Sequence, residues 1–135
     1  STTTIKATVP AGAATGKVTV TTTSGTATST GTYTAGTVPS APTGVTATAN
    51  ATGSKSAAIT WTQGSNGGVA LSGQTIRAYT STGTTVIKTV NVSGTAVSGT
   101  VTGLTSGTSY RFTVTATNSL GSSLASAYSN TVTAR

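Results

Sequence analysis

Residues 109–117 read SYRFTVTAT, and this stretch decides the fold. Aromatic or apolar residues stand at every second position from Tyr110 to Ala116, with polar residues between them. A period of two places all of these side chains on one face of a β-strand. The stretch therefore predicts a strand with one face against a core and the other toward solvent.

The same pattern recurs along the chain from residue 45 onward, between turns rich in Gly, Ser and Asn. We expect further strands at residues 45–50, 56–62, 74–81, 84–90, 95–101 and 128–133. Seven short strands at this spacing are typical of a Greek-key β-sandwich. No segment shows a helical period, so the fold class is all-β.

The first part of the chain also has β character. Residues 4–9 and 17–22 alternate, and residues 26–34 form a third strand-like run. Turns are expected at Pro10–Gly12 and Ser24–Gly25, which makes about two hairpins of β-structure.

A junction follows at residues 38–43, VPSAPT, which hold two of the three prolines. Proline cannot donate a hydrogen bond to a sheet, so this segment is not the interior of a strand. We expect a partial β unit over residues 1–36, a Pro-containing junction over 37–43 and a sandwich domain over 44–135.

Most catalytic side chains are missing. The chain contains no Asp, Glu, His or Cys, and acid–base chemistry at neutral pH relies mostly on these residues together with Lys and Tyr. Ser-His-Asp, Cys-His and paired-carboxylate mechanisms are therefore excluded. The four lysines, Lys6, Lys17, Lys55 and Lys88, stand among Thr, Ser and Gly with no partner that would activate an amine. We expect that the protein is not an enzyme.

The same absences argue against metals and cofactors. Zinc is held by Cys, His or carboxylate, and calcium and magnesium prefer carboxylate oxygens. We expect no cofactor and assign no catalytic, cofactor-binding or metal-ligating residue. The binding surface stays unassigned, because nothing in the sequence distinguishes contact residues from solvated ones.

The chain is strongly basic, with a net charge of +7 and a pI near 10.5. Its cations are Lys6, Lys17, Lys55, Arg77, Lys88, Arg111 and Arg135. They are scattered along the sequence, and nucleic-acid binding usually shows a cluster instead. We expect no specific nucleic-acid partner. Two interpretations of the positive charge remain. It can attract anionic cell-wall polymers, polysaccharides or acidic proteins without a defined site, or it can simply keep the protein soluble.

Aromatic residues are few, and their roles differ. Trp61 lies in a predicted strand and is expected in the core, where its large ring would be removed from water. For Tyr33, Tyr79 and Tyr128 two interpretations remain: a position at the edge of the core, or an exposed contact with a partner. Two tripeptides, Asn50-Ala51-Thr52 and Asn91-Val92-Ser93, are acceptor sequences for N-glycosylation whose use depends on the host.

Pro39–Pro42 is followed by the alternating residues Val45–Ala47, and Trp61 and the segments LTSGTSY and YRFTVTATN come later in the chain. With these features, residues 38–135 resemble a fibronectin type III domain. Pro39–Ala47 resembles the family's approach to its first strand, and Trp61 stands where the family keeps its core tryptophan. Residues 104–110, LTSGTSY, resemble the loop that ends in the corner tyrosine, and YRFTVTATN followed by Gly121 resembles the sixth strand and its exit. The resemblance implies an immunoglobulin-like Greek-key sandwich in which the Tyr110 hydroxyl binds nearby backbone.

Residues 5–12, IKATVPAG, with VTV at 18–20 and GTA at 25–27, resemble the C-terminal half of an IPT/TIG domain, which is also immunoglobulin-like. The front half of that domain is missing. About 35 residues cannot close a sandwich alone. Either the chain is a fragment, or another chain supplies the missing strands, which implies strand donation and polymerisation.

Both resemblances imply a spacer, adhesive or protein-interaction module. We expect a secreted, non-catalytic structural or adhesive module of a bacterial surface assembly, such as a fibre, sheath or adhesin. Its expected partners are proteins or copies of itself, and no apolar run is long enough to span a membrane. The alternatives are an accessory module of a secreted carbohydrate-active enzyme and a decoration or tail component of a phage virion. The missing initiator Met suggests a processed or excised piece.

Overall fold

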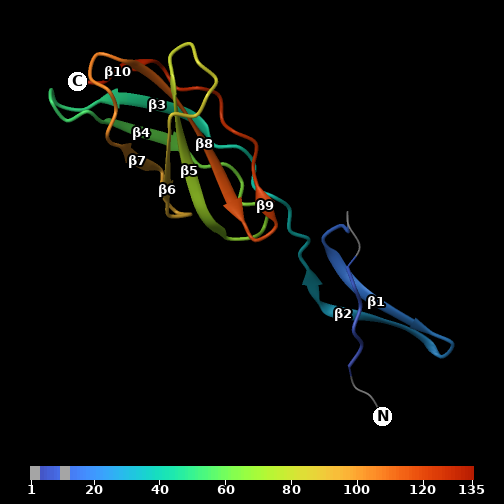
Figure 1. Cartoon of the computed structure of the whole chain (residues 1–135). Coiled ribbons are helices and arrows are strands. Elements are labelled where there is room, and N and C mark those ends of the chain that lie inside the picture. The colour runs from blue at the N-terminus through green and yellow to red at the C-terminus, as the bar shows by residue number, and fades with distance from the viewer. Residues whose placement is uncertain (1–3, 10–12) are drawn as a thin grey trace. The chain divides into compact units, whose positions relative to one another are not determined.

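The computed structural model describes residues 4–9 and 13–135 (Figure 1). The chain divides into an N-terminal unit, Ser1–Gly36, and a C-terminal unit, Thr37–Arg135, and each is described here by itself. Among the described residues every regular element is a β-strand. The all-β fold class predicted from the sequence is confirmed.

The N-terminal unit contains one antiparallel hairpin, β1 (Gly16–Thr22) and β2 (Gly25–Tyr33), joined by a tight turn. The pairing is irregular between Lys17 and Thr19, which marks a β-bulge. Residues 4–9 form no strand, contrary to the prediction. Alternation makes a strand only where a neighbour supplies hydrogen-bond partners, and neither β1 nor β2 pairs with this segment. The predicted turn at Pro10–Gly12 lies outside the described residues.

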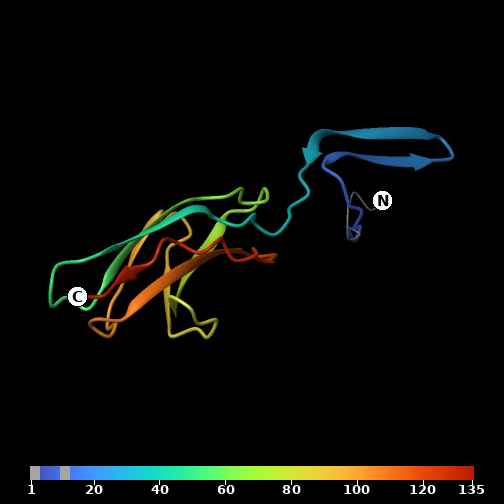
Figure 2. The same cartoon turned by 90° about the horizontal axis from the view of Figure 1, so that it is seen from above.

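The C-terminal unit is a sandwich of two antiparallel sheets (Figures 1 and 2). One sheet has the order β3-β4-β7, formed by Thr43–Ala49, Ala57–Thr62 and Ser98–Val101. The other has the order β10-β8-β5-β6, formed by Val132–Thr133, Ser109–Asn118, Leu71–Thr80 and Lys88–Val92, and β9 (Gly121–Ser122) pairs with β8. Because β5 crosses to the second sheet and β7 returns to the first, this is the Greek-key arrangement that the strand spacing predicted.

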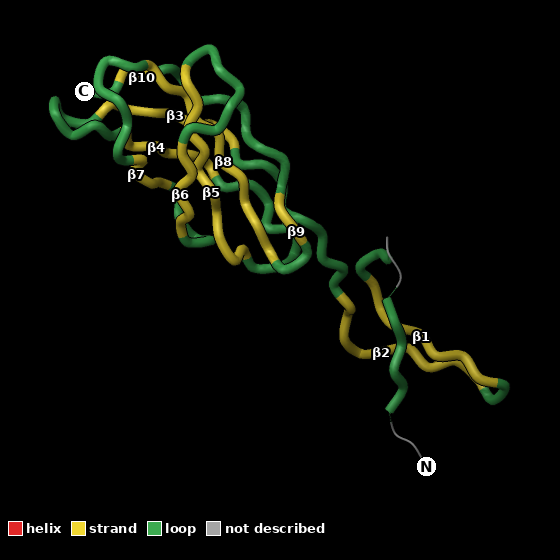
Figure 3. The backbone as a smooth tube through the Cα atoms, viewed as in Figure 1, coloured by secondary structure: helices red, strands yellow, loops and turns green. Residues whose placement is uncertain are grey.

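Two predicted strands begin later than expected. β6 begins at Lys88 and β7 at Ser98, and the residues before them are loops (Figure 3). Since β5 ends at Thr80, the predicted strand residues 84–87 have almost no neighbour to pair with, and only the Ile87 N–H reaches β5, at the Ala78 carbonyl.

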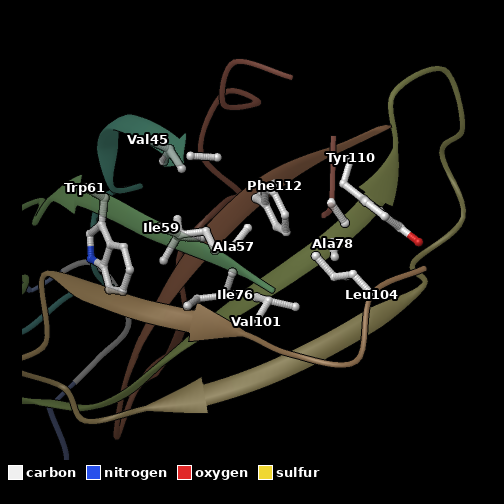
Figure 4. Packing of buried hydrophobic residues seen from close by; sticks show 13 residues of the cluster. Val45, Ala57, Ile59, Trp61, Ile76, Ala78, Val101, Leu104, Tyr110 and Phe112 are labelled. Atoms are coloured by element: carbon white, nitrogen blue, oxygen red, sulfur yellow. The ribbon is translucent and has the colours of Figure 1, made fainter. Parts of the chain in front are cut away.

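The core lies between the sheets and is built from their inward-facing residues (Figure 4). The alternation from Tyr110 to Ala116 is confirmed, because all four of its apolar or aromatic side chains are buried. Tyr110, Phe112 and Val114 belong to one cluster with residues of the strands opposite and alongside, among them Ile59, Trp61 and Ile76. Full burial of each large side chain contributes about 1.5–3 kcal/mol. Trp61 is 5% exposed, so its predicted core position is also confirmed.

The corner predicted at Tyr110 is present. The Tyr110 hydroxyl accepts a hydrogen bond of 3.1 Å from the Thr105 N–H, which fixes the loop between β7 and β8. The hydroxyl therefore satisfies a backbone donor while the ring stays in the core.

A serine ladder runs from Ser123 to Ser129, into the start of the last strand predicted at residues 128–133. Ser123, Ser126 and Ser129 each donate their backbone N–H to a β8 carbonyl. Their hydroxyls accept from the N–H groups of Ala116, Val114 and Phe112 at 3.0–3.1 Å. Every third residue therefore faces β8, whereas a strand would present every second one. Only Val132–Thr133 form a regular strand, β10.

The fold is expected to be nearly independent of pH between pH 2 and pH 8. Stability depends on pH only where the folded and unfolded states bind different numbers of protons. No side chain of this composition titrates between about pH 2 and pH 9. The measurement is a series of thermal unfolding curves at constant ionic strength. A midpoint lower by roughly 10 °C at pH 2 contradicts the expectation, since that shift corresponds to more than about 1 kcal/mol.

Candidate functional site

The cavity beside residues 63–71, 94 and 95 carries no charged side chain. This cavity of about 300 Å³ lies beside Gln63, Gly64, Asn66, Ala70, Leu71, Gly94 and Thr95. Its polar groups are amides, hydroxyls and backbone, none of which is a general acid or base at neutral pH. No group of metal-ligating side chains occurs in the part of the chain that the structure describes.

The exposed aromatic residues do not form a platform. The rings of Tyr79 and Tyr128 meet edge to face, with centroids 5.3 Å apart and planes at 89°. The Arg111 guanidinium lies 3.8 Å from the centroid of the Tyr128 ring, which is a cation–π contact. Tyr79 is buried, whereas Tyr128 and Tyr33 are exposed. Because the rings of Tyr79 and Tyr128 are perpendicular and Arg111 lies over Tyr128, this pair forms no flat stacking surface for a sugar.

The two sequons have different environments. Asn50 is half-buried, and its side-chain amide donates to the Ser56 hydroxyl at 2.7 Å. Asn91 is exposed on β6, where its carbonyl oxygen accepts from the Thr75 hydroxyl at 3.0 Å. Asn91 is therefore the more accessible acceptor, and N-glycosylation stays a prediction.

The chain enters the C-terminal unit at one pole and leaves it at the other (Figure 1). At the N-terminal pole, the Thr37 N–H donates to the Gly67 carbonyl and the Thr37 carbonyl accepts from Asn118, both at 2.8 Å. At the C-terminal pole, the Arg135 carbonyl accepts from the Lys55 N–H at 2.8 Å. The loops of the N-terminal pole are residues 63–70, 93–97 and 119–124, and those of the C-terminal pole are residues 50–56, 81–87 and 102–108.

The two poles of the C-terminal unit differ in charge. The loops of the N-terminal pole contain no charged residue. At the C-terminal pole, the Lys55 backbone bonds to both Arg135 and Leu104. The Lys88 ammonium lies against Gly103, the residue before Leu104. The fold thus gathers cations that are far apart in sequence.

The outer edge of β3 is closed by a side chain. The Asn130 amide accepts from the Ala47 N–H at 2.8 Å and donates to the Ala47 carbonyl at 2.9 Å. The Asn130 amide thus bonds to the Ala47 N–H and carbonyl, the backbone groups to which a further strand would bond. At this residue the edge of β3 cannot pair with another chain unless Asn130 is displaced.

The hairpin of the N-terminal unit has the opposite character. Val18 and Val20 of β1 are 53% and 38% exposed, and Ile5 upstream is 74% exposed. An isolated two-stranded hairpin is marginally stable in water. The unit therefore presents apolar strand surface that a neighbour could cover.

The comparisons agree with the sandwich. The sequence model of the fibronectin type III domain matches residues 40–132, more than half of the chain. Titin domains A168–A170 match with a TM-score of 0.66 and 26% identity over 81% of this chain and 36% of that one.

Chicken CNTN1 domains FN1–FN3 match with a TM-score of 0.62 and 24% identity over 72% of this chain and 33% of that one. The chain thus spans about a third of the length of these structures. No curated protein matches it, and none of the described residues forms a helix able to cross a membrane.

Proposed function

The chain belongs to the fibronectin type III family, and on that premise we propose that it is a structural and adhesive module of a bacterial extracellular surface assembly, such as a fibre, sheath or adhesin. Domains of this family are non-catalytic modules in many extracellular proteins. The missing acid–base residues are consistent with a passive mechanism. Localisation at the cell surface belongs to the proposal.

The observation that carries the proposal is the position of the two chain ends of the C-terminal unit at opposite poles. A module of this kind transmits the chain from one end to the other, so that successive modules extend in series. Its ten-residue strand β8 accounts for about 33 Å of that length. The Asn130 amide at Ala47 opposes strand addition at that point of the β3 edge.

The hairpin supplies the second part of the proposal. We assign it, following its resemblance to the C-terminal half of an IPT/TIG domain, to a sandwich that strands of another copy complete. The exposed Val18 and Val20 support this assignment, because strand addition would bury their side chains. Polymers would then form by heterologous contacts, each copy receiving strands from the next.

Light scattering combined with negative-stain imaging of the chain tests this function. We expect ordered polymers that grow with protein concentration. The double variant Val18→Lys/Val20→Lys should be monomeric, whereas Val86→Lys/Val97→Lys, which also replaces exposed valines and adds the same charge, should still polymerise. A wild-type chain that stays monomeric at every concentration rejects strand donation, and equal loss in both variants rejects the hairpin as its site.

A further inference from the structure

Lys88 places its ammonium group at the turn that follows β7. The nitrogen lies 2.6 Å from the position that a Cβ atom would occupy at Gly103. Gly103 also has a φ of +67°, which side-chain-bearing residues rarely adopt. The ammonium group therefore lies directly beside this turn. The sequence contains no carboxylate side chain that could neutralise this charge.

Lys55 reaches the same turn from the loop between β3 and β4. Its carbonyl accepts from the Leu104 N–H at 2.9 Å, and its N–H donates to the Arg135 carbonyl at 2.8 Å. Lys55 is also the one non-glycine residue with positive φ, +49°, among the residues that the structure describes. Such a conformation is uncommon and is held here by the two backbone hydrogen bonds. Three segments of the chain thus bring Lys55, Lys88 and Arg135 to one pole.

We propose that this pole binds a linear, base-free phosphate polymer, whose phosphates contact Lys55, Lys88 and Arg135. The inference deepens the proposed function, on which it rests, by naming a partner for the surface module. Charge complementarity supports it, because nothing in the sequence except a free C-terminus offsets the cations at pH 7.

The chemistry of the pole favours phosphate in a polymer. Both residue types of this pole bind phosphate, lysine as a compact point charge and arginine through its planar, bidentate guanidinium. One exposed ion pair is worth at most about 1 kcal/mol. A single anion is therefore held weakly, while a polymer engages several cations together and releases its counterions.

The lack of a free aromatic ring separates this polymer from a nucleic acid. The loops of the C-terminal pole, residues 50–56, 81–87 and 102–108, contain no Phe, Tyr or Trp. The exposed ring beside them, Tyr128, already carries the Arg111 guanidinium 3.8 Å from its centroid, and Arg111 donates to the Gly83 carbonyl. Proteins that bind single strands use aromatic rings to stack bases. Since the loops contain no ring and Tyr128 is already stacked on Arg111, the bases of a nucleic acid add little to the contacts of a simpler phosphate chain.

The test is a titration of the full chain with inorganic polyphosphate at low salt, followed by two-dimensional NMR and fluorescence anisotropy. We expect the largest shift changes at Lys55, Lys88 and Gly103. Oligo-dT of equal charge should bind no more tightly than polyphosphate, and polyglutamate should bind more weakly. Tighter binding of oligo-dT overturns the base-free assignment, and equal or tighter binding of polyglutamate overturns the phosphate assignment.

Matched variants separate a site from diffuse attraction. Lys55→Gln/Lys88→Gln and Lys6→Gln/Lys17→Gln both lower the net charge from +7 by two. In the first variant we expect roughly a tenfold loss of affinity for polyphosphate. The slope of log affinity against log salt concentration should also be smaller by about 1.5. In the second variant we expect less than about a twofold loss of affinity. Equal losses, or shifts spread evenly over the chain, reject the site.

Two further readouts keep the test decisive. Lys55→Arg/Lys88→Arg keeps both charges and should still bind polyphosphate. This variant provides the comparison if the glutamine variant fails to fold. Light scattering of the same samples reports polymerisation separately. Polymers that form without binding polyphosphate reject this inference alone.

Discussion

Replacing Gln74 by Leu should lower the free energy of unfolding of the C-terminal unit by about 3–5 kcal/mol. Gln74 is 1% exposed, so its side chain lies in the core. Its carbonyl oxygen accepts from the Trp61 indole N–H at 2.8 Å, and its amide donates to the Gly94 and Ala96 carbonyls at 3.1 and 2.5 Å. Leucine fills the space but removes the amide that bonds to the Trp61 N–H and to the Gly94 and Ala96 carbonyls. Each buried polar group left without a hydrogen-bond partner lowers the free energy of unfolding by about 1–3 kcal/mol.

Urea unfolding followed by tryptophan fluorescence measures this loss, because Trp61 is the sole tryptophan. Gln63→Leu is the matched control. Gln63 is half-buried and donates to the same Gly94 carbonyl at 2.7 Å, and Gln74 continues to satisfy that carbonyl when Gln63 is changed. The control should cost less than about 1 kcal/mol. A Gln74→Leu variant as stable as the control shows that the buried amide is dispensable.

The sequence could predict those features of the fold that depend only on the spacing of residues along one strand. The alternation from Tyr110 to Ala116 and the buried Trp61 were both visible, because a period of two fixes which residues share a face. Gln74 shares the inward face of Ile76, yet its burial depends on partners in two other segments. Pattern alone cannot show that a polar side chain has such partners.

The charged pole was missed for a related reason. Lys55, Lys88 and Arg135 belong to a loop, a strand and the chain end, which only the Greek-key connections bring together. Counting charges along the chain therefore gave a scattered pattern. The signal in the sequence that bears on this pole is the absence of Asp and Glu, which leaves the lysines and arginines without an acidic side chain as partner.

The serine ladder was also hidden, because Ser123, Ser126 and Ser129 read as ordinary polar residues of a loop and a strand. Each is buried and closes a ring of two hydrogen bonds with one residue of β8. Their hydroxyls in turn donate to the next carbonyl along the chain, at 2.7–2.8 Å. The hydroxyl thus completes hydrogen bonding that a regular strand would supply with its backbone.

Changing all three serines to alanine should therefore lower the free energy of unfolding by about 3–6 kcal/mol, since each change leaves a buried β8 N–H without its acceptor. The amides of Phe112, Val114 and Ala116 lose that acceptor directly. Hydrogen exchange measured by NMR should show these three amides opening faster than the rest of β8, in addition to the global loss seen in urea.

A triple variant of exposed serines, Ser98→Ala/Ser106→Ala/Ser119→Ala, provides the control. It removes the same number of hydroxyls from solvated positions, where substitutions usually change stability by less than about 0.5 kcal/mol each. Equal stability of the two triple variants contradicts the ladder. A global loss without faster exchange at the three amides places the destabilisation elsewhere. The expected pattern, a large loss with local opening along β8, makes the hydroxyls the groups that bind the final segment to the sheet.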